Sequence, residues 1–369
     1  MIYYLLFFLL ALCVVLSATA SKKQTFFLTF ISFVLVVLFQ GLRWERGTDW
    51  ESYYYMFYFP AEPKWYYEYG WYQLNHIVYE LTGSFTVRLV VESAVILLLY
   101  LRFAKYIGLH NTTAIVLSCF ASSIFPVRFA LASGIVLNSY QYLIDKNIWK
   151  FVLLVLLAST IHMACLLVLP IYFFPRRSFQ LKTLLVLYLL SIIFSYASKT
   201  VLSYLVWFNS VLGAGMDSDM QDKVGGYLEE GISDYSVRSV LSILLSYLNA
   251  AFFIWLFWFF LKKMKRNKKI SSTIKGKQMI NRYTVLLNLY VFGLCLNRIV
   301  QFSVPYLSRI GILISAGFTW MLLIGIEKLY TKQKRLLYFV WVIYIFIIYC
   351  SILNGQYYKL FIPYKSIFN

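Results

Sequence analysis

Charged residues are scarce in this chain of 369 residues, since Asp, Glu, Lys and Arg together make up only 13% of it. A soluble domain carries about 25% charged residues, whereas this chain is 61% hydrophobic with a mean hydropathy of +0.70. That deficit excludes an ordinary soluble domain. Apolar runs such as Phe151–Ala158 also lack the alternating polarity of a membrane β-strand. The composition therefore predicts an all-α, polytopic integral membrane protein.

The chain also lacks the signatures of nucleotide, cofactor and metal chemistry. It has no Gly-rich nucleotide loop after a strand, no HExxH and no GxSxG. Its five cysteines lie in apolar runs without CxxC or metal-ligand spacing, which predicts buried free thiols. Asp217, Asp219 and Asp222 lie in a Gly-containing loop and are interpreted as loop solvation. We therefore expect neither a cofactor nor a metal.

The few charges are unbalanced, with 34 Lys and Arg against 15 Asp and Glu. An excess of +19 can indicate nucleic-acid binding. Here most basic residues lie in short links between apolar runs, as orientation signals do. The densest cluster, a basic loop near 262–280, is interpreted as a cytoplasmic loop that touches anionic lipid. We expect membrane lipids as partners, and no nucleic acid.

Apolar segments predict about twelve membrane segments in one polytopic membrane domain, residues 1–369. They lie near 2–18, 25–40, 84–103, 113–126, 128–144, 150–161, 162–175, 181–198, 237–261, 281–300, 308–327 and 336–353. With the basic clusters in the cytoplasm, both termini lie outside and the longest outer loops lie near 40–69 and 198–236. The polar segment 70–83 is predicted to be an amphipathic helix at the outer interface.

Four consecutive segments between 113 and 175 are short for membrane spans. They form two hairpins, one around Pro126–Arg128 and one around His162. Helices that stop inside a membrane are tolerated where their ends line an enclosed or wet cavity. We interpret these segments as paired, re-entrant hairpins.

The segment Gly41–Phe57, GLRWERGTDWESYYYMF, concentrates charges and aromatic residues directly after an apolar run. It is either an extramembrane loop with interfacial aromatics or a platform for a substrate with an anionic headgroup. Each of four arginines near outer ends of spans could snorkel to lipid headgroups. Together they favour an anion site, because a guanidinium matches phosphate in a bidentate fork. These arginines are Arg43, Arg128, Arg298 and Arg309.

Two further polar features lie inside apolar segments. Arg88 and Glu92 are spaced i,i+4, and we interpret them as an intrahelical ion pair. Among three histidines, His162 alone lies within a membrane hairpin. It is either a hydrogen-bonded packing residue or a proton acceptor near neutral pH.

The order of these features resembles the EpsG-type family of Wzy-like polysaccharide polymerases. GLRWERGTDWESYY resembles the early outer loop of that family, and Glu68–Gly70 with the following helix resembles its next block. FPVRFALASGIVL, ASTIHMACLLVLP, LSRIGILIS and YKLFIPYKSIF resemble its arginine hairpin, histidine hairpin, late arginine span and terminal Pro-Tyr motif. Phe129 departs from the family pattern, which commonly has glutamine there.

The resemblance implies a glycosyltransferase that polymerises undecaprenyl-diphosphate-linked repeat units into O-antigen, capsule or exopolysaccharide. The reaction would occur at the outer face of the bacterial inner (cytoplasmic) membrane, without a nucleotide sugar. Undecaprenyl-diphosphate-linked glycans are then the substrates, and a chain-length regulator and a flippase are candidate partners. A flippase, an O-antigen ligase and a membrane O-acyltransferase are the alternatives.

On this hypothesis the site residues divide into three groups. The diphosphates are bound by Arg43, Arg46, Arg298 and Arg309. The catalytic group comprises Arg128, which stabilises charge on the leaving diphosphate, and a proton acceptor chosen among His162, Asp49 and Glu45. The sugar or the lipid edge contacts Trp50, Tyr53 and Tyr54.

Overall fold

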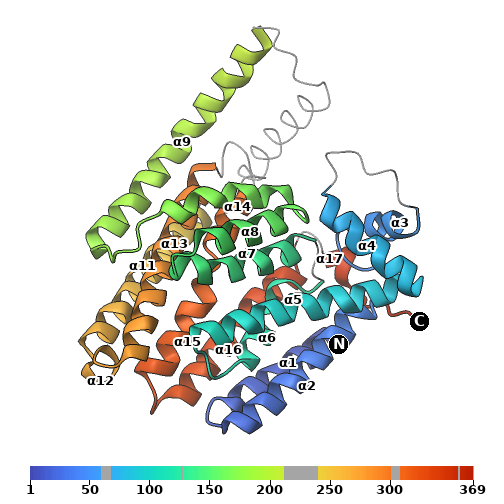
Figure 1. The fold of residues 1–369 in the computed structure, drawn as a ribbon, viewed down its shortest axis with the longest axis horizontal. Helices are drawn as coiled ribbons and strands as arrows, with labels where there is room; N and C mark the ends of the chain where they lie inside the picture. Colours follow the sequence, from blue (N-terminus) through green and yellow to red (C-terminus); the bar gives the residue numbers. More distant parts are fainter. Residues whose placement is uncertain (60–67, 126–127, 212–239, 301–307, 356–357, 369) are drawn as a thin grey trace. The chain divides into compact units, whose positions relative to one another are not determined.

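The computed structural model describes residues 1–59, 68–125, 128–211, 240–300, 308–355 and 358–368 (Figure 1). Within these ranges the regular elements are all helices, so the all-α prediction is confirmed there. The chain forms two compact units. Unit 1 comprises Met1–Tyr172 and Leu323–Asn369, and unit 2 comprises Phe173–Leu322. We describe each unit by itself.

Unit 1 is a helical bundle in which α5 and α6 are central. In it α5 packs on α2, α6 and α7, while α6 also contacts α1 and α16. Its helices before the unit boundary are α1 (Ile2–Ser17), α2 (Lys22–Gly41), α3 (Trp50–Tyr58), α4 (Tyr69–Thr82), α5 (Phe85–Ile107), α6 (Thr113–Ser122), α7 (Arg128–Ile144) and α8 (Ile148–Ser159). The others are the 3₁₀ helix η1 (Met163–Phe173), α15 (Phe318–Leu329), α16 (Lys334–Leu353) and α17 (Tyr358–Phe361), with η1 and α15 crossing the boundary.

Local sequence signals explain where several of these helices begin and end. Ser21 and Gln24 form a capping box at the start of α2. The side chain of Ser84 accepts a hydrogen bond from the Val87 N–H and caps α5, which ends at the left-handed Gly108. The segment η1 contains Pro170, which cannot donate an α-helical hydrogen bond. Its 3₁₀ conformation differs from the α-helix expected near 162–175.

Unit 2 is built around one long helix, α13 (Ile274–Val300), which packs on α9 (Leu181–Val211), α11 (Val240–Arg266) and α14 (Ser308–Ile314). The short α12 (Lys268–Ser271) precedes it. Helices α13 and α14 approach closely at two glycines. A Cβ added to Gly293 would lie 2.7 Å from the Gly311 carbonyl oxygen, and one on Gly311 would lie 2.8 Å from that of Gly293. Small residues permit such contact between membrane helices.

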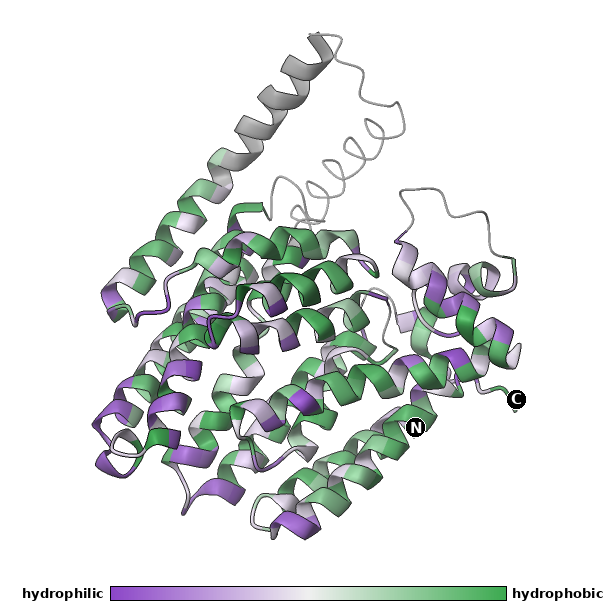
Figure 2. Ribbon diagram, viewed as in Figure 1, coloured by the Kyte–Doolittle hydropathy of each residue, from purple (hydrophilic) through white to green (hydrophobic). Residues whose placement is uncertain are grey.

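Five helical segments are long and apolar enough to cross a membrane, among the residues described. They are Lys22–Gly41, Leu241–Arg266, Ile274–Val300, Arg309–Leu329 and Lys334–Leu353. Five shorter apolar helices, including α1 and α8, accompany them. Figure 2 shows apolar residues along most helices and hydrophilic ones gathered around α12 and the start of α2. The protein is therefore a membrane protein, while the count of about twelve segments remains a prediction.

Helix lengths differ from the predictions mainly where charges were expected to end a helix. The basic segment near 262–280 is largely helical, because α11 runs to Arg266 and α13 begins at Ile274. Lys and Arg are good helix formers, so a charge cluster does not by itself break a helix. Segment 70–83 forms α4 as expected, and the outer loop near 40–69 contains α3. The loop near 198–236 lies mostly outside the described residues, apart from the end of α9.

The five cysteines are free thiols, in agreement with the sequence. Only Cys165 is buried, however, and the other four are half-buried. Cys119 and Cys295 each line a pocket in the protein, which accounts for their partial exposure.

Candidate functional site

Glu68 connects two residues that the sequence analysis selected independently, Arg128 and His162. Its Oε2 accepts an ion-paired hydrogen bond from Nη1 of Arg128, and its Oε1 lies 3.8 Å from Nδ1 of His162. The same Oε1 accepts a hydrogen bond from the Met163 N–H at 2.9 Å. The side chains of Arg128, Glu68 and His162 are 27%, 12% and 3% exposed. The three residues form a charged cluster that solvent reaches from the Arg128 side.

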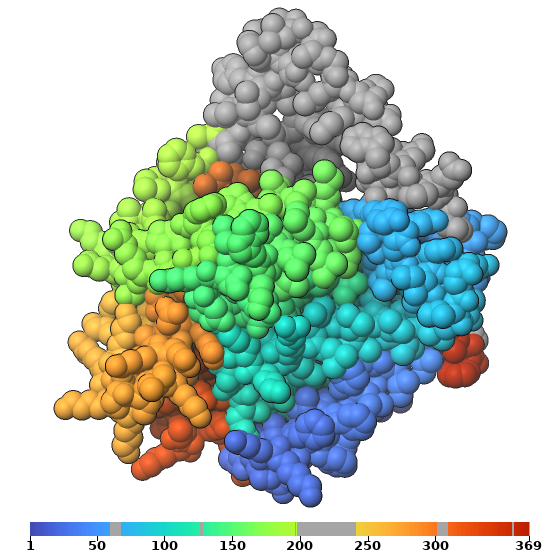
Figure 3. Space-filling view, in the orientation of Figure 1, coloured from blue at the N-terminus to red at the C-terminus, as the bar shows by residue number. Residues whose placement is uncertain are grey.

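The main chain fixes this cluster where the start of α4 meets the turn between α8 and η1. The Thr160 carbonyl accepts hydrogen bonds from the N–H groups of Gly70 (2.8 Å) and Trp71 (3.2 Å). A Cβ on Gly70 would lie 2.2 Å from the Thr160 hydroxyl oxygen, so only glycine allows this approach. The surfaces of α4 and α8 consequently adjoin (Figure 3). The contact holds Glu68, just before α4, beside His162.

Phe129 packs its ring edge-on against His162, with the ring centroids 5.2 Å apart. This is the position where the EpsG-type pattern commonly has glutamine. An aromatic ring cannot replace the amide as a hydrogen-bond partner, so in this chain Phe129 orients the imidazole by packing alone.

A second charged group, Arg88 with Glu92, is fully buried in unit 1. The predicted ion pair is confirmed, with Nη1 of Arg88 2.8 Å from Oε2 of Glu92. Nε of Arg88 donates to Oδ1 of Asn75 at 3.0 Å, and its guanidinium lies over the rings of Trp71 and Tyr53 at 4.4 and 5.2 Å. Within the part of the chain that the structure describes, Nη2 of Arg88 and Oε1 of Glu92 have no hydrogen-bond partner. Buried polar atoms of this kind commonly bind water or a ligand.

Tyr53 lies against the buried guanidinium of Arg88. Burial and the Asp49 carboxylate raise the pKa of Tyr53, while the positive charges of Arg128 and Arg88 oppose that shift. Its hydroxyl donates a long hydrogen bond of 3.4 Å to Oδ2 of Asp49. Tyr53 thus contacts Arg88 through its ring and Asp49 through its hydroxyl.

The loop after α2 is held by the C-terminal segment of the chain. Arg43 pairs through its backbone with Ser366, and the Trp44 N–H donates to the Lys365 carbonyl at 2.9 Å. Nζ of Lys365 forms an ion pair of 2.7 Å with Oε2 of Glu45. Nε of Arg46 donates to the Pro363 carbonyl. These contacts, far apart in sequence, fix the loop on which four predicted site residues stand: Arg43, Glu45, Arg46 and Asp49.

The loop residues differ sharply in exposure. Arg43 is buried with its guanidinium 5.0 Å from the centre of the Phe125 ring, and burial lowers its pKa to about 10. Arg43 is still charged at neutral pH, but its side chain lies inside the protein. Arg46 is half-buried, and Glu45 and Asp49 are exposed. The hydrogen bond from Lys365 lowers the pKa of Glu45, which makes that carboxylate a weaker proton acceptor than an ordinary glutamate.

Two of the three predicted sugar-binding aromatics are buried in the protein. Trp50 stacks on Tyr54 at 5.0 Å between ring centroids, and Tyr53 packs on Trp71 at 5.2 Å. The exposed fractions of Trp50 and Tyr53 are 8% and 7%. The rings of Trp50 and Tyr53 pack on other aromatic rings of this cluster. Of the three predicted residues, the half-buried Tyr54 is therefore the one exposed enough to stack directly on a sugar.

Arg298 and Arg309, predicted to bind diphosphate, belong to unit 2. The Arg298 guanidinium donates to the Ser246 hydroxyl at 2.9 Å and lies 4.7 Å from the centre of the Tyr247 ring. Arg309 is exposed at the start of α14. Their predicted role remains a prediction.

Three functional candidates were not selected from the sequence: Glu68, Asn75 and Lys365. The sequence singles out Glu68 only as part of a family block. Acidic residues are few in this chain, 15 in all, and that scarcity is the signal that points to Glu68. No group of three His, Cys, Asp or Glu residues able to hold a metal occurs among the described residues.

Comparison with known proteins gives one match. The model of the EpsG family matches residues 26–366 of the 369. No curated protein and no solved structure matches the chain. The family match includes every residue of the Glu68, Arg128 and His162 cluster, the loop after α2 and nearly all of the C-terminal segment. The chain belongs to the EpsG family.

Proposed function

We propose that this protein is a glycosyltransferase that polymerises lipid-linked oligosaccharide repeat units into polysaccharide. Membership of the EpsG family suggests a polysaccharide polymerase. The observation that carries the proposal is the contact of Glu68 with both Arg128 and His162. It joins a phosphate-binding side chain to a proton acceptor in one partly open site.

In the proposed reaction the donor is a growing glycan on undecaprenyl diphosphate, and the acceptor is one lipid-linked repeat. A hydroxyl oxygen of the acceptor attacks the anomeric carbon and forms the new glycosidic bond. The bond between that carbon and the diphosphate breaks, and the diphosphate takes the electron pair. The hydroxyl proton passes to His162. No nucleotide sugar takes part.

Arg128 stabilises the negative charge that develops on the leaving diphosphate. A guanidinium that meets charge only as it forms lowers the barrier rather than merely tightening binding. Arg128 lies beside the carboxylate of Glu68 and is 27% exposed, so a diphosphate can share its donors. Arg46 binds the diphosphate at the rim, whereas the buried Arg43 shapes the loop.

His162 is the proton acceptor in this proposal, and Glu68 positions it. A carboxylate beside one ring nitrogen stabilises the imidazolium that forms when the other nitrogen takes a proton. Asp49 is the alternative acceptor, because its carboxylate is exposed and contacts the Tyr53 hydroxyl. The outer face of the inner membrane, with both termini on that side, is the location that we propose.

The test is reconstitution of the purified protein with a defined undecaprenyl-diphosphate-linked repeat, with chain extension read on a gel. His162→Gln is expected to lower kcat by about 10²–10⁴, the usual contribution of a general acid–base group. His76→Gln is the matched control, because His76 lies on α4 with a side chain 45% exposed. Full activity of folded His162→Gln would assign the proton to another group, and inactivity of the wild-type protein would overturn the proposed function.

A further inference from the structure

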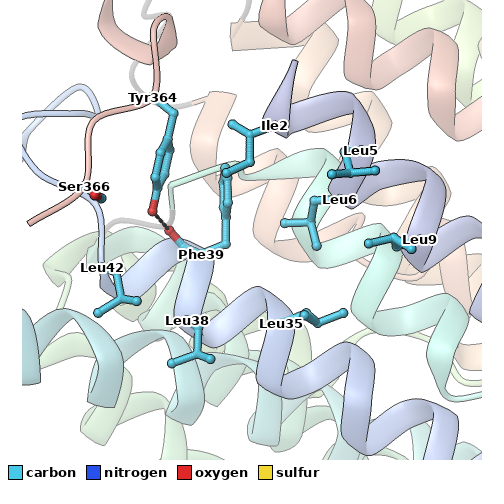
Figure 4. A pocket seen from close by; sticks show the side chains of 10 residues that line it. All are labelled: Ile2, Leu5, Leu6, Leu9, Leu35, Leu38, Phe39, Leu42, Tyr364 and Ser366. Atoms are coloured by element: carbon cyan, nitrogen blue, oxygen red, sulfur yellow. Dashed lines mark hydrogen bonds between the residues drawn. The ribbon is translucent and has the colours of Figure 1, made fainter. Parts of the chain in front are cut away.

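An apolar groove runs between α1 and α2 in unit 1, with a volume of about 490 Å³. Figure 4 shows the side chains of both helices directed into it, with Tyr364 and Ser366 of the C-terminal segment at one end. Its size is within the range of small-molecule sites. The aliphatic lining includes Ile2, Leu5, Leu9, Leu35, Leu38 and Leu42. Such a lining suits a hydrocarbon chain.

The groove has one polar end, which is built by the C-terminal segment. The Tyr364 hydroxyl donates to the Phe39 carbonyl at 2.8 Å, and the two rings stack with centroids 4.6 Å apart. These two contacts fix the Tyr364 ring, which closes one end of the groove. Directly beyond it, Lys365 lies beside Glu45, and Arg46 contacts the Pro363 carbonyl. Two cations and one carboxylate give this rim a net positive charge.

An apolar groove that ends at a positive rim matches one kind of ligand: a hydrocarbon chain with an anionic headgroup. A single groove between two helices accommodates one chain, whereas a membrane phospholipid carries two. The rim also belongs to the loop after α2, which carries the predicted site residues Arg43 and Asp49. The polar end of the groove therefore lies at that loop.

We infer that this groove holds the polyprenyl chain of the lipid-linked glycan next to its diphosphate, with Arg46 and Lys365 at the diphosphate end. The inference rests on the proposed function and adds a subsite to it. It makes α1, α2 and the C-terminal segment determinants of substrate recognition. The length of the polyprenyl chain should then affect KM more than kcat, because the far end of the chain is remote from the bond that breaks.

The test fills the groove without disturbing the protein core. Leu5→Trp and Leu38→Trp place a larger side chain in the groove, and both leucines are exposed in the protein, by 57% and 45%. Leu12→Trp is the matched control, because Leu12 is 56% exposed on α1 and does not line the groove. KM and kcat are measured with donors that carry a long or a short polyprenyl chain.

The wild type and Leu12→Trp are expected to have a lower KM for the long-chain donor. Both groove variants should raise that KM about tenfold, the order expected when a few CH₂ groups lose burial, with kcat retained. Equal behaviour of the groove variants and Leu12→Trp would overturn the inference while leaving the proposed function intact. A wild type that forms no polymer from either donor would instead overturn the proposed function.

A binding measurement that does not depend on turnover completes the test. A photoreactive long-chain polyprenyl phosphate is expected to label peptides of α1 and α2 in the wild type and to lose this labelling in Leu38→Trp. Unlabelled polyprenyl diphosphate should compete, and phosphatidylglycerol should not. Equal competition by phosphatidylglycerol would make the groove a general lipid contact and would overturn the inference.

Discussion

Glu68 and Glu327 are both acids of unit 1 that accept hydrogen bonds from main-chain N–H groups, yet their remaining contacts differ. Glu327 accepts from the N–H groups of His110 and Asn111 at 3.0 and 2.7 Å and from the Tyr338 hydroxyl at 3.1 Å. Its side chain is 2% exposed, with Nζ of Lys328 3.7 Å away. Donors of the main chain and a buried hydroxyl thus occupy its oxygens permanently. Glu327 joins the α5–α6 link to α15 and α16.

Glu68 has one main-chain donor, Met163, and shares its other contacts with two ionisable side chains. Arg128 is partly exposed and His162 can gain or lose a proton. Two of the three contacts of Glu68 can therefore be exchanged, because Arg128 and His162 meet it through ionisable side chains and not through main-chain N–H groups. The comparison shows that an acid with permanent donors stabilises the fold, while an acid with exchangeable partners can take part in chemistry.

Among the variants of this comparison, the largest effect is expected for Arg128, an ionisable partner of Glu68. Arg128→Ala should lower kcat for chain extension by about 10²–10³, the usual cost of losing one group that stabilises transition-state charge. Arg102→Ala is the control, because Arg102 is an exposed arginine on α5 outside the cluster. Kinetics of the reconstituted enzyme provide the measurement. An Arg128→Ala protein that extends chains at the rate of Arg102→Ala would remove Arg128 from the catalytic group.

The next effect should fall on stability rather than on catalysis. Glu327→Ala leaves the buried N–H groups of His110 and Asn111 without their acceptor, and each such loss costs about 1–3 kcal/mol. Thermal unfolding in detergent should shift to clearly lower temperature, while the folded fraction keeps its kcat. Glu80→Ala, at a side chain that is 64% exposed, should leave the transition unchanged. An unaltered unfolding temperature for Glu327→Ala would contradict the structural role.

Glu68→Gln separates the two kinds of acid most directly. The amide oxygen can still accept the Met163 N–H, so the fold should be nearly as stable as the wild type. The negative charge beside His162 is lost, and kcat should fall about tenfold, a fraction of the ~10²–10⁴ that general acid–base catalysis supplies. KM should change little. A variant that loses stability but keeps its kcat would show that Glu68, like Glu327, has a structural role.

Part of this arrangement could be predicted because it depends on local sequence. Helices such as α2 and α16 follow from apolar runs, and α4 follows from its amphipathic pattern. Arg128 and His162 were selected because a polar residue in an apolar segment is costly and usually has a role. Each of these signals lies within a few residues of the feature that it predicts.

The rest depends on contacts between distant segments, for which the sequence holds no local signal. Glu68 meets His162 only because α4 and the α8–η1 turn approach at Gly70 and Thr160. Likewise, Tyr and Trp serve equally as buried packing residues or as exposed platforms. The pattern of residues 50–54 therefore could not show that Trp50 and Tyr53 are buried while Tyr54 is half-buried.

The smallest expected effect concerns Glu45 and Lys365, an exposed pair that connects the loop after α2 to the C-terminal segment. The Lys365 hydrogen bond lowers the pKa of Glu45 in the folded protein below its ordinary value of 4.5. A lowered pKa means that the folded state favours the ionised carboxylate. The contribution to stability is therefore present above the ordinary pKa and is lost as the pH falls through the lower value of the folded state.

Comparison of the wild type with Glu45→Gln tests this sign. At pH 7 the variant should unfold at a slightly lower temperature, because an exposed ion pair contributes little to stability. As the pH falls through the lowered pKa of Glu45 in the folded protein, the wild-type carboxylate becomes protonated and the difference should disappear. High salt at pH 7 should reduce it too, since exposed pairs are screened. A difference that persists at low pH and in high salt would assign the stability to packing of the Glu45 side chain and not to its charge.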